Sequence, residues 1–151
     1  MNQNNNKVIQ IGMNIIFSMA GLYTRFIDAG FETPKYLLTI KKGNTILKII
    51  IANILDLYKF DNILLVANIK DVKYREIIES CLKSYENTSV IFIDNTDGQA
   101  HTVSIGIEYL KCNVKPFSSK LVIHNIDTIV IGRDFYKIES FKLIFGAFFI
   151  I

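Results

Sequence analysis

The residues best suited to bind an anion lie in one polar stretch near the N-terminus, Met19–Lys35. Ala20 and Gly21 are small, so the backbone N–H groups beside them can come close to a ligand. Arg25 carries a guanidinium fork and Lys35 a point charge, and both attract phosphate oxygens. The stretch is either a phosphate-binding loop or a solvated loop with incidental charges. It contains neither the P-loop pattern GxxxxGK[ST] nor the dinucleotide pattern GxGxxG.

Two further segments carry side chains that suit nucleotide chemistry. In DGQAHTV, residues 97–103, Gly98 permits close backbone approach and the Gln99 amide can bind a base edge or a ribose. The alternative is that this segment is only the N-terminus of a helix. Asp127 ends the apolar segment LVIHNID. A carboxylate there either binds Mg²⁺ together with substrate phosphates or caps the following turn.

The elements that must position these residues alternate between short apolar runs and helical patterns. Apolar runs bounded by turn residues predict buried strands, and apolar residues at helical spacing predict amphipathic helices. The predicted strands are 14–18, 36–40, 62–68, 88–94 and 119–127. The predicted helices are 45–60 and 71–85, with Thr45 and Asp71 as their N-caps, and 97–111 is predicted to be a turn followed by a third helix. Such alternation is typical of βαβ units. The sequence therefore predicts an α/β fold, a Rossmann-like three-layer αβα domain with a mostly parallel sheet.

All three polar segments are expected at one edge of that sheet. In open parallel sheets, ligands bind outside the carboxyl ends of the strands. The stretch after 14–18, the polar residues after 88–94 and Asp127 each follow a predicted strand. They are therefore expected to converge on one site.

Taken in order, these segments resemble the signature of the sugar-phosphate nucleotidyltransferases, in the branch that serves capsule biosynthesis. That signature has a loop of small residues ending in Thr-Arg or Ser-Arg, followed by Pro-Lys. Here the loop reads MAGLYTR, residues 19–25, and Pro34-Lys35 follows. DGQAHTV is similar to the nucleotide-contacting segment of the family, and LVIHNIDT to its metal-binding strand end. Tyr23 departs from the broader family, in which glycine is usual at that position.

The resemblance implies a fold of the nucleotide-diphospho-sugar transferase type and a Mg²⁺-dependent reaction. A nucleoside monophosphate would pass from an NTP to a sugar phosphate or similar phosphorylated acceptor, with release of pyrophosphate, for capsule or surface polysaccharide biosynthesis. The roles implied are catalytic for Arg25 and Lys35, nucleotide-binding for Met19, Ala20, Gly21, Gly98 and Gln99, and Mg²⁺-binding for Asp127.

Length and composition suit a single domain with a substantial core, since the chain has 151 residues, of which 50% are hydrophobic. Residues 1–12 are expected to form a tail, either a flexible lead-in or a short edge strand. Residues 13–151 would form the nucleotide-binding domain, incomplete at its C-terminus. A net charge of +3 with scattered lysines argues against a nucleic-acid partner. No signal peptide or membrane span is apparent, which indicates a cytoplasmic protein.

Two functions stay open at this point. One is the nucleotidyltransferase. The other is a truncated, catalytically inactive protein that binds nucleotide or serves as a partner subunit. The apolar run LIFGAFFII, residues 143–151, favours the second. An exposed surface of that kind requires a covering domain or a partner, including a second copy of the chain.

Overall fold

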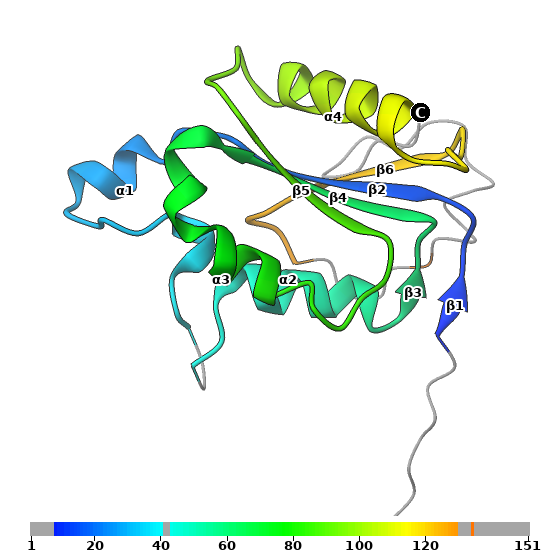
Figure 1. Ribbon diagram of the computed structural model, residues 1–151. Coiled ribbons are helices and arrows are strands. Elements are labelled where there is room, and N and C mark those ends of the chain that lie inside the picture. The colour runs from blue at the N-terminus through cyan, green and yellow to red at the C-terminus, as the bar shows by residue number, and fades with distance from the viewer. Residues whose placement is uncertain (1–7, 41–42, 130–133, 135–151) are drawn as a thin grey trace, which may run out of the picture.

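A computed structural model describes residues 8–40, 43–129 and 134 of the chain. Its centre is a four-stranded parallel sheet with the strand order β5–β4–β2–β6 (Figure 1). The strands are β2 (Asn14–Met19), β4 (Asn62–Asn68), β5 (Thr88–Ile93) and β6 (Leu121–Asn125). Helices α2 and α3 cover one face and α4 the other (Figure 1). The predicted α/β, three-layer αβα fold is therefore confirmed.

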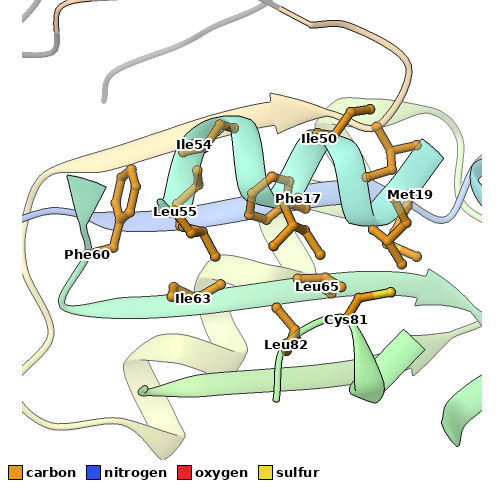
Figure 2. Packing of buried hydrophobic residues seen from close by; sticks show 14 of the residues in the cluster. Phe17, Met19, Ile50, Ile54, Leu55, Phe60, Ile63, Leu65, Cys81 and Leu82 are labelled. Carbon is orange, nitrogen blue, oxygen red and sulfur yellow. The ribbon is translucent and has the colours of Figure 1, made fainter. Parts of the chain in front are cut away.

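The larger core lies between the sheet and the helices α2 (Ile46–Leu55) and α3 (Arg75–Ser80). α2 begins as predicted, because the Thr45 hydroxyl accepts a hydrogen bond from the Lys48 backbone N–H at 3.2 Å. Odd-numbered positions of β2 and β4 face this core, together with side chains from α2 and from the turn after α3. Figure 2 labels Phe17, Met19, Ile50, Ile54, Leu55, Phe60, Ile63, Leu65, Cys81 and Leu82.

The opposite face of the sheet packs against α4 (Gln99–Asn113). Here Ile16, Leu64 and Val66 contact the helix. Gly106 permits this close approach, since a Cβ at that position would lie 3.1 Å from methyl groups of Ile16 and Val66. Because β2 and β4 are buried on both faces, they appear in the sequence as continuous apolar runs.

The predicted strand 36–40 is wrong. The chain instead forms the 3₁₀ helix η1 (Lys35–Leu37), in which the Leu37 N–H donates to the Pro34 carbonyl at 2.8 Å. Tyr36 and Leu37 are adjacent and both buried, a pattern that a half-buried strand does not give. Of the predicted strand, only an isolated bridge between Thr39 and Thr45 exists.

Two predicted helices are shorter than expected. Helix 45–60 ends at Leu55, and the chain continues into β3 (Tyr58–Lys59), which pairs with β1 (Ile9–Gln10). A short strand is therefore present within the expected tail. Helix 71–85 is split into a 3₁₀ helix, η2 (Ile69–Tyr74), and α3. The first of these begins at Asn68, whose side chain accepts a hydrogen bond from the Lys70 backbone N–H at 3.0 Å and so caps η2.

Within the described part of the chain, no helix is both long enough and apolar enough to span a bilayer. The apolar run 143–151, proposed as a contact between copies of the chain, lies outside the described residues.

Candidate functional site

A cavity of about 430 Å³ opens at the carboxyl ends of the central strands. The ends of β2 and β6 form its base, and the start of α4 and the segment that carries η1 form its sides. The lining residues are Ser18, Met19, Ala20, Gly21, Leu22, Tyr23, Lys35, Tyr36, Thr96, Gly98, Gln99, Thr102, Asn125, Ile126 and Asp127. The three polar segments found in the sequence therefore meet here, at the predicted edge of the sheet.

Seven of the eight predicted site residues line this cavity, namely Met19, Ala20, Gly21, Lys35, Gly98, Gln99 and Asp127. The eighth, Arg25, is not among the described residues that line it. Arg25 lies in the short helix α1 (Thr24–Asp28), which projects beyond the sheet, and its side chain is exposed (Figure 1). Its catalytic role therefore stays a prediction from the sequence.

Lys35 and Asp127 form an ion pair on the cavity wall. The Lys35 Nζ lies 2.9 Å from the Asp127 Oδ2. This hydrogen bond holds the pKa of the Asp127 carboxyl below its usual value, so the carboxylate is ionised at neutral pH. The two side chains are 31% and 56% exposed. Both charges are therefore within reach of an incoming ligand.

Among the described residues that line the cavity, Asp127 supplies the one carboxylate, a type of ligand that Mg²⁺ prefers. Among the described residues, no cluster of three or more His, Cys, Asp or Glu side chains is placed to hold a metal. Mg²⁺ in phosphate-transfer sites is commonly bound through one or two carboxylates plus substrate phosphates, and it keeps several waters. Asp127 therefore fits Mg²⁺ held jointly with a phosphate ligand and not in a preformed cage.

The two glycines of the site are glycines for different reasons. Gly98 has a φ of 121° and a ψ of −174°, a backbone conformation that residues other than glycine rarely adopt. Gly21 has no positive φ, and a Cβ added to it would meet nothing within 4 Å. The fold itself therefore requires glycine at position 98. At position 21, the absence of a side chain leaves cavity space open.

The N-terminus of α4 borders the cavity and favours a bound anion. Its first turn carries backbone N–H groups and the positive end of the helix dipole. Gly98 ends the preceding loop, and its carbonyl accepts the Thr102 N–H at 3.1 Å. The Gln99 amide donates to the Asn125 Oδ1, which joins the helix to the end of β6. Together with Lys35, this helix terminus makes the cavity suitable for a phosphate-bearing ligand.

Asn68, at the end of β4, is a positioning residue that the sequence reasoning missed. Its buried side-chain N–H₂ donates to the Ala20 carbonyl at 3.2 Å and to the Asn95 Oδ1 at 3.1 Å. It thereby ties the small-residue loop to the chain that leaves β5. A signal existed in the sequence, because Asn68 ends the apolar run NILLVAN at the same sheet edge as the other site residues.

Asp71 was predicted as a helix N-cap, and this prediction is wrong. The side chain is completely buried and accepts hydrogen bonds from two tyrosine hydroxyls. Tyr23 donates to Oδ1 at 2.6 Å and Tyr36 donates to Oδ2 at 2.7 Å. Tyr23 therefore serves as an anchor for the loop that bears it.

No protein-family model matches the chain, and no curated protein matches it. Among solved structures, the chain is similar to a nucleoside-diphosphate-sugar pyrophosphorylase from Vibrio cholerae RC9, with 26% identity and a TM-score of 0.62. That match covers 82% of this chain and 52% of the other.

Two further solved structures share the fold at lower identity. One is a 4-diphosphocytidyl-2C-methyl-D-erythritol synthase from Anaerococcus prevotii DSM 20548, with 20% identity, a TM-score of 0.50 and coverage of 79% of this chain and 43% of that one. The other is Rv0371c from Mycobacterium tuberculosis H37Rv, with 18% identity, a TM-score of 0.56 and coverage of 82% and 56%. The chain thus spans about half the length of these structures.

Proposed function

We propose that the chain carries the nucleotide site of a nucleotidyltransferase. The enzyme would move a nucleoside monophosphate from an NTP to a sugar phosphate or similar phosphorylated acceptor and release pyrophosphate. One observation carries the proposal: Lys35 and Asp127 face each other on a cavity that is also lined by the open Gly21 loop. The similarity to a sugar-nucleotide pyrophosphorylase supports the same class of reaction.

The proposed reaction needs positioning and charge neutralisation more than proton transfer. A phosphate oxygen of the acceptor attacks the α-phosphorus, and the bond from that phosphorus to the β-phosphate bridging oxygen breaks. Backbone N–H groups near Gly21 would hold the triphosphate. The Lys35 ammonium would leave Asp127 and stabilise the charge that develops on the departing pyrophosphate. Gln99 would contact the base or ribose, and Arg25 would supply a second cation to the phosphates.

Asp127 would hold Mg²⁺ together with phosphate oxygens of the NTP. When bound, the ion neutralises phosphate charge and helps to align the triphosphate. The resemblance in sequence extends the proposal to capsule or other surface polysaccharide synthesis, in the cytoplasm where NTPs are available.

A pyrophosphate assay tests the proposal. The chain is incubated with each NTP and a series of sugar phosphates, with and without Mg²⁺, while NTP binding is measured separately by calorimetry. We expect release that requires both an acceptor and Mg²⁺. NTP binding without release for every acceptor would favour the alternative, an inactive nucleotide-binding or partner-subunit protein. A chain that binds no NTP and releases no pyrophosphate would contradict the nucleotidyltransferase and leave only the partner-subunit role.

A further inference from the structure

Two tyrosines that line the cavity share one buried carboxylate, that of Asp71. The Tyr23 hydroxyl lies 2.6 Å from the Asp71 Oδ1, and the Tyr36 hydroxyl lies 2.7 Å from the Asp71 Oδ2. Each oxygen of the carboxylate thus accepts one hydroxyl. Asp71 has no exposed surface, and both tyrosines line the cavity. The carboxylate therefore lies behind the cavity wall, where a ligand does not reach it.

The chemistry of this cluster makes it a strong anchor. A buried charge is tolerated only when hydrogen bonds compensate its lost hydration, and hydrogen bonds to an ionised acceptor are short and strong. Burial and the neighbouring Asp71 raise the pKa of both tyrosine hydroxyls above their usual value. The hydroxyls therefore stay protonated and donate at any pH at which the protein would work.

The two tyrosines belong to the two parts of the chain on which the proposed reaction depends. Tyr23 lies two residues after Gly21 and precedes α1, so it holds the far end of the small-residue loop. Tyr36 is the neighbour of Lys35 within η1 and is itself buried. One carboxylate on η2 thus sets the position of the loop relative to the Lys35 ammonium.

We propose that Asp71 is a positioning residue of the site. Through its hydrogen bonds to Tyr23 and Tyr36, it fixes the position of the Gly21 loop relative to Lys35. The kinetic consequence rests on the proposed function, whereas the mechanical coupling does not. Two other hydrogen bonds also hold this part of the chain. The Asn68 side chain donates to the Ala20 carbonyl at 3.2 Å, and the Tyr74 hydroxyl donates to the carbonyl of Glu32, between α1 and η1, at 3.2 Å.

Hydrogen exchange measured by mass spectrometry tests the coupling without any substrate. The full chain is compared with its Tyr36→Phe and Tyr23→Phe variants. The Phe26 and Ile27 amides donate to the Tyr23 carbonyl at 2.9 Å and 3.2 Å, so their exchange reports whether Tyr23 is held in place. We expect Tyr36→Phe to accelerate exchange of these two amides by about tenfold, the scale of one lost hydrogen bond to a charged group. Tyr23→Phe should accelerate exchange at 35–38 in the same way. Acceleration confined to the segment that carries the substitution would overturn the proposal.

Steady-state kinetics test the consequence for the reaction. Tyr36→Phe should lower kcat for pyrophosphate release by about tenfold, because Lys35 acts mainly on the transition state. The Kd for the NTP should change less than about threefold, since an interaction made mainly in the transition state adds little to binding of the ground state. Asp71→Asn keeps the shape of the side chain and can hydrogen bond both hydroxyls, so its loss should be smaller than that of Asp71→Leu. Equal losses for the two Asp71 variants, or an unchanged kcat in Tyr36→Phe, would contradict the positioning role.

Tyr85→Phe is the matched control. The Tyr85 hydroxyl donates to the Asp56 Oδ1 at 2.6 Å, a bond of the same kind that lies away from the cavity. Its removal should leave kcat and the exchange of the Phe26 and Ile27 amides unchanged. The outcomes also separate the two proposals. A wild-type chain that binds no NTP contradicts the proposed function, while the exchange data still decide whether Asp71 couples the loop to η1.

Discussion

The Lys35 ammonium lies 2.9 Å from the Asp127 carboxylate, although 92 positions of the sequence separate the two residues. The cation proposed for phosphate and the carboxylate proposed for Mg²⁺ thus neutralise each other before substrate binds. A metal–NTP complex carries both charges that are needed to replace this pair. It can give a phosphate to Lys35 and a cation to Asp127 in one binding event.

Replacement of Lys35 by glutamine should abolish most turnover and leave the fold intact. We expect kcat for pyrophosphate release to fall by about 10²- to 10³-fold, the usual cost of one preorganised group that stabilises transition-state charge. The free energy of unfolding should change by less than about 1 kcal/mol, because the ion pair is partly exposed. Lys59→Gln is the control, since it removes the Lys59–Glu86 pair at 2.7 Å outside the cavity. Equal turnover in both variants would contradict the role of Lys35.

Acid should remove the stability that Asp127 contributes. Its pKa in the folded protein is lowered from the usual 3.8, so the unfolded chain takes up the proton first as the pH falls. The contribution is therefore complete well above pH 3.8 and is lost as the pH falls through the folded pKa. Urea unfolding of the wild type and Asp127→Asn between pH 2 and pH 6 measures it. The difference in unfolding free energy should be small, below about 1 kcal/mol, and should shrink in acid. A difference that grows as the pH falls would contradict a lowered pKa of Asp127 in the folded protein.

The two glycines of the site should respond differently to alanine. Gly21→Ala should leave the free energy of unfolding unchanged or raise it by up to about 1 kcal/mol, because the backbone and the open space both accept a methyl group. It should nevertheless weaken NTP binding, since the methyl group occupies the wall of the cavity. Gly98→Ala should instead lower stability by about 1–3 kcal/mol through backbone strain. Urea unfolding and calorimetric NTP titration measure the two effects. Unweakened NTP binding by Gly21→Ala would show that the triphosphate lies elsewhere.

Alkaline conditions should destabilise the protein partly through Tyr36. Burial and the Asp71 carboxylate raise its pKa in the folded state above the unfolded value of about 10. Above pH 10 the unfolded chain therefore loses this proton and the folded chain retains it, so stability falls as the pH rises. One such proton corresponds to about 1.4 kcal/mol per pH unit. In urea unfolding between pH 9 and pH 11, Tyr36→Phe should show a shallower fall than the wild type. Parallel curves would mean that Tyr36 does not titrate in this way.

The order of elements followed from local patterns, because burial on both faces of a parallel strand leaves a continuous apolar run. β2, β4, β5 and β6 were predicted within a few residues of their bounds, and so was α4. The pattern of apolar residues led to a wrong prediction where a segment is buried but is neither a regular helix nor a strand. The apolar residues of 36–40 suggested a strand, yet Tyr36 and Leu37 point into the core from a 3₁₀ turn.

The sequence by itself determined the parallel sheet and the edge at which its polar segments meet, since a parallel sheet brings the carboxyl ends of its strands to the same side. Only the tertiary structure decided which of those residues lie together. Lys35 forms an ion pair with Asp127, and Arg25 is not among the described residues that line the cavity. Asp71, expected to cap a helix, is instead buried and accepts hydrogen bonds from two tyrosine hydroxyls. The physical reason is that the spacing of apolar residues along the sequence indicates only which face of a helix or strand is buried. Contacts between side chains far apart in the chain depend on how loops close over the finished sheet.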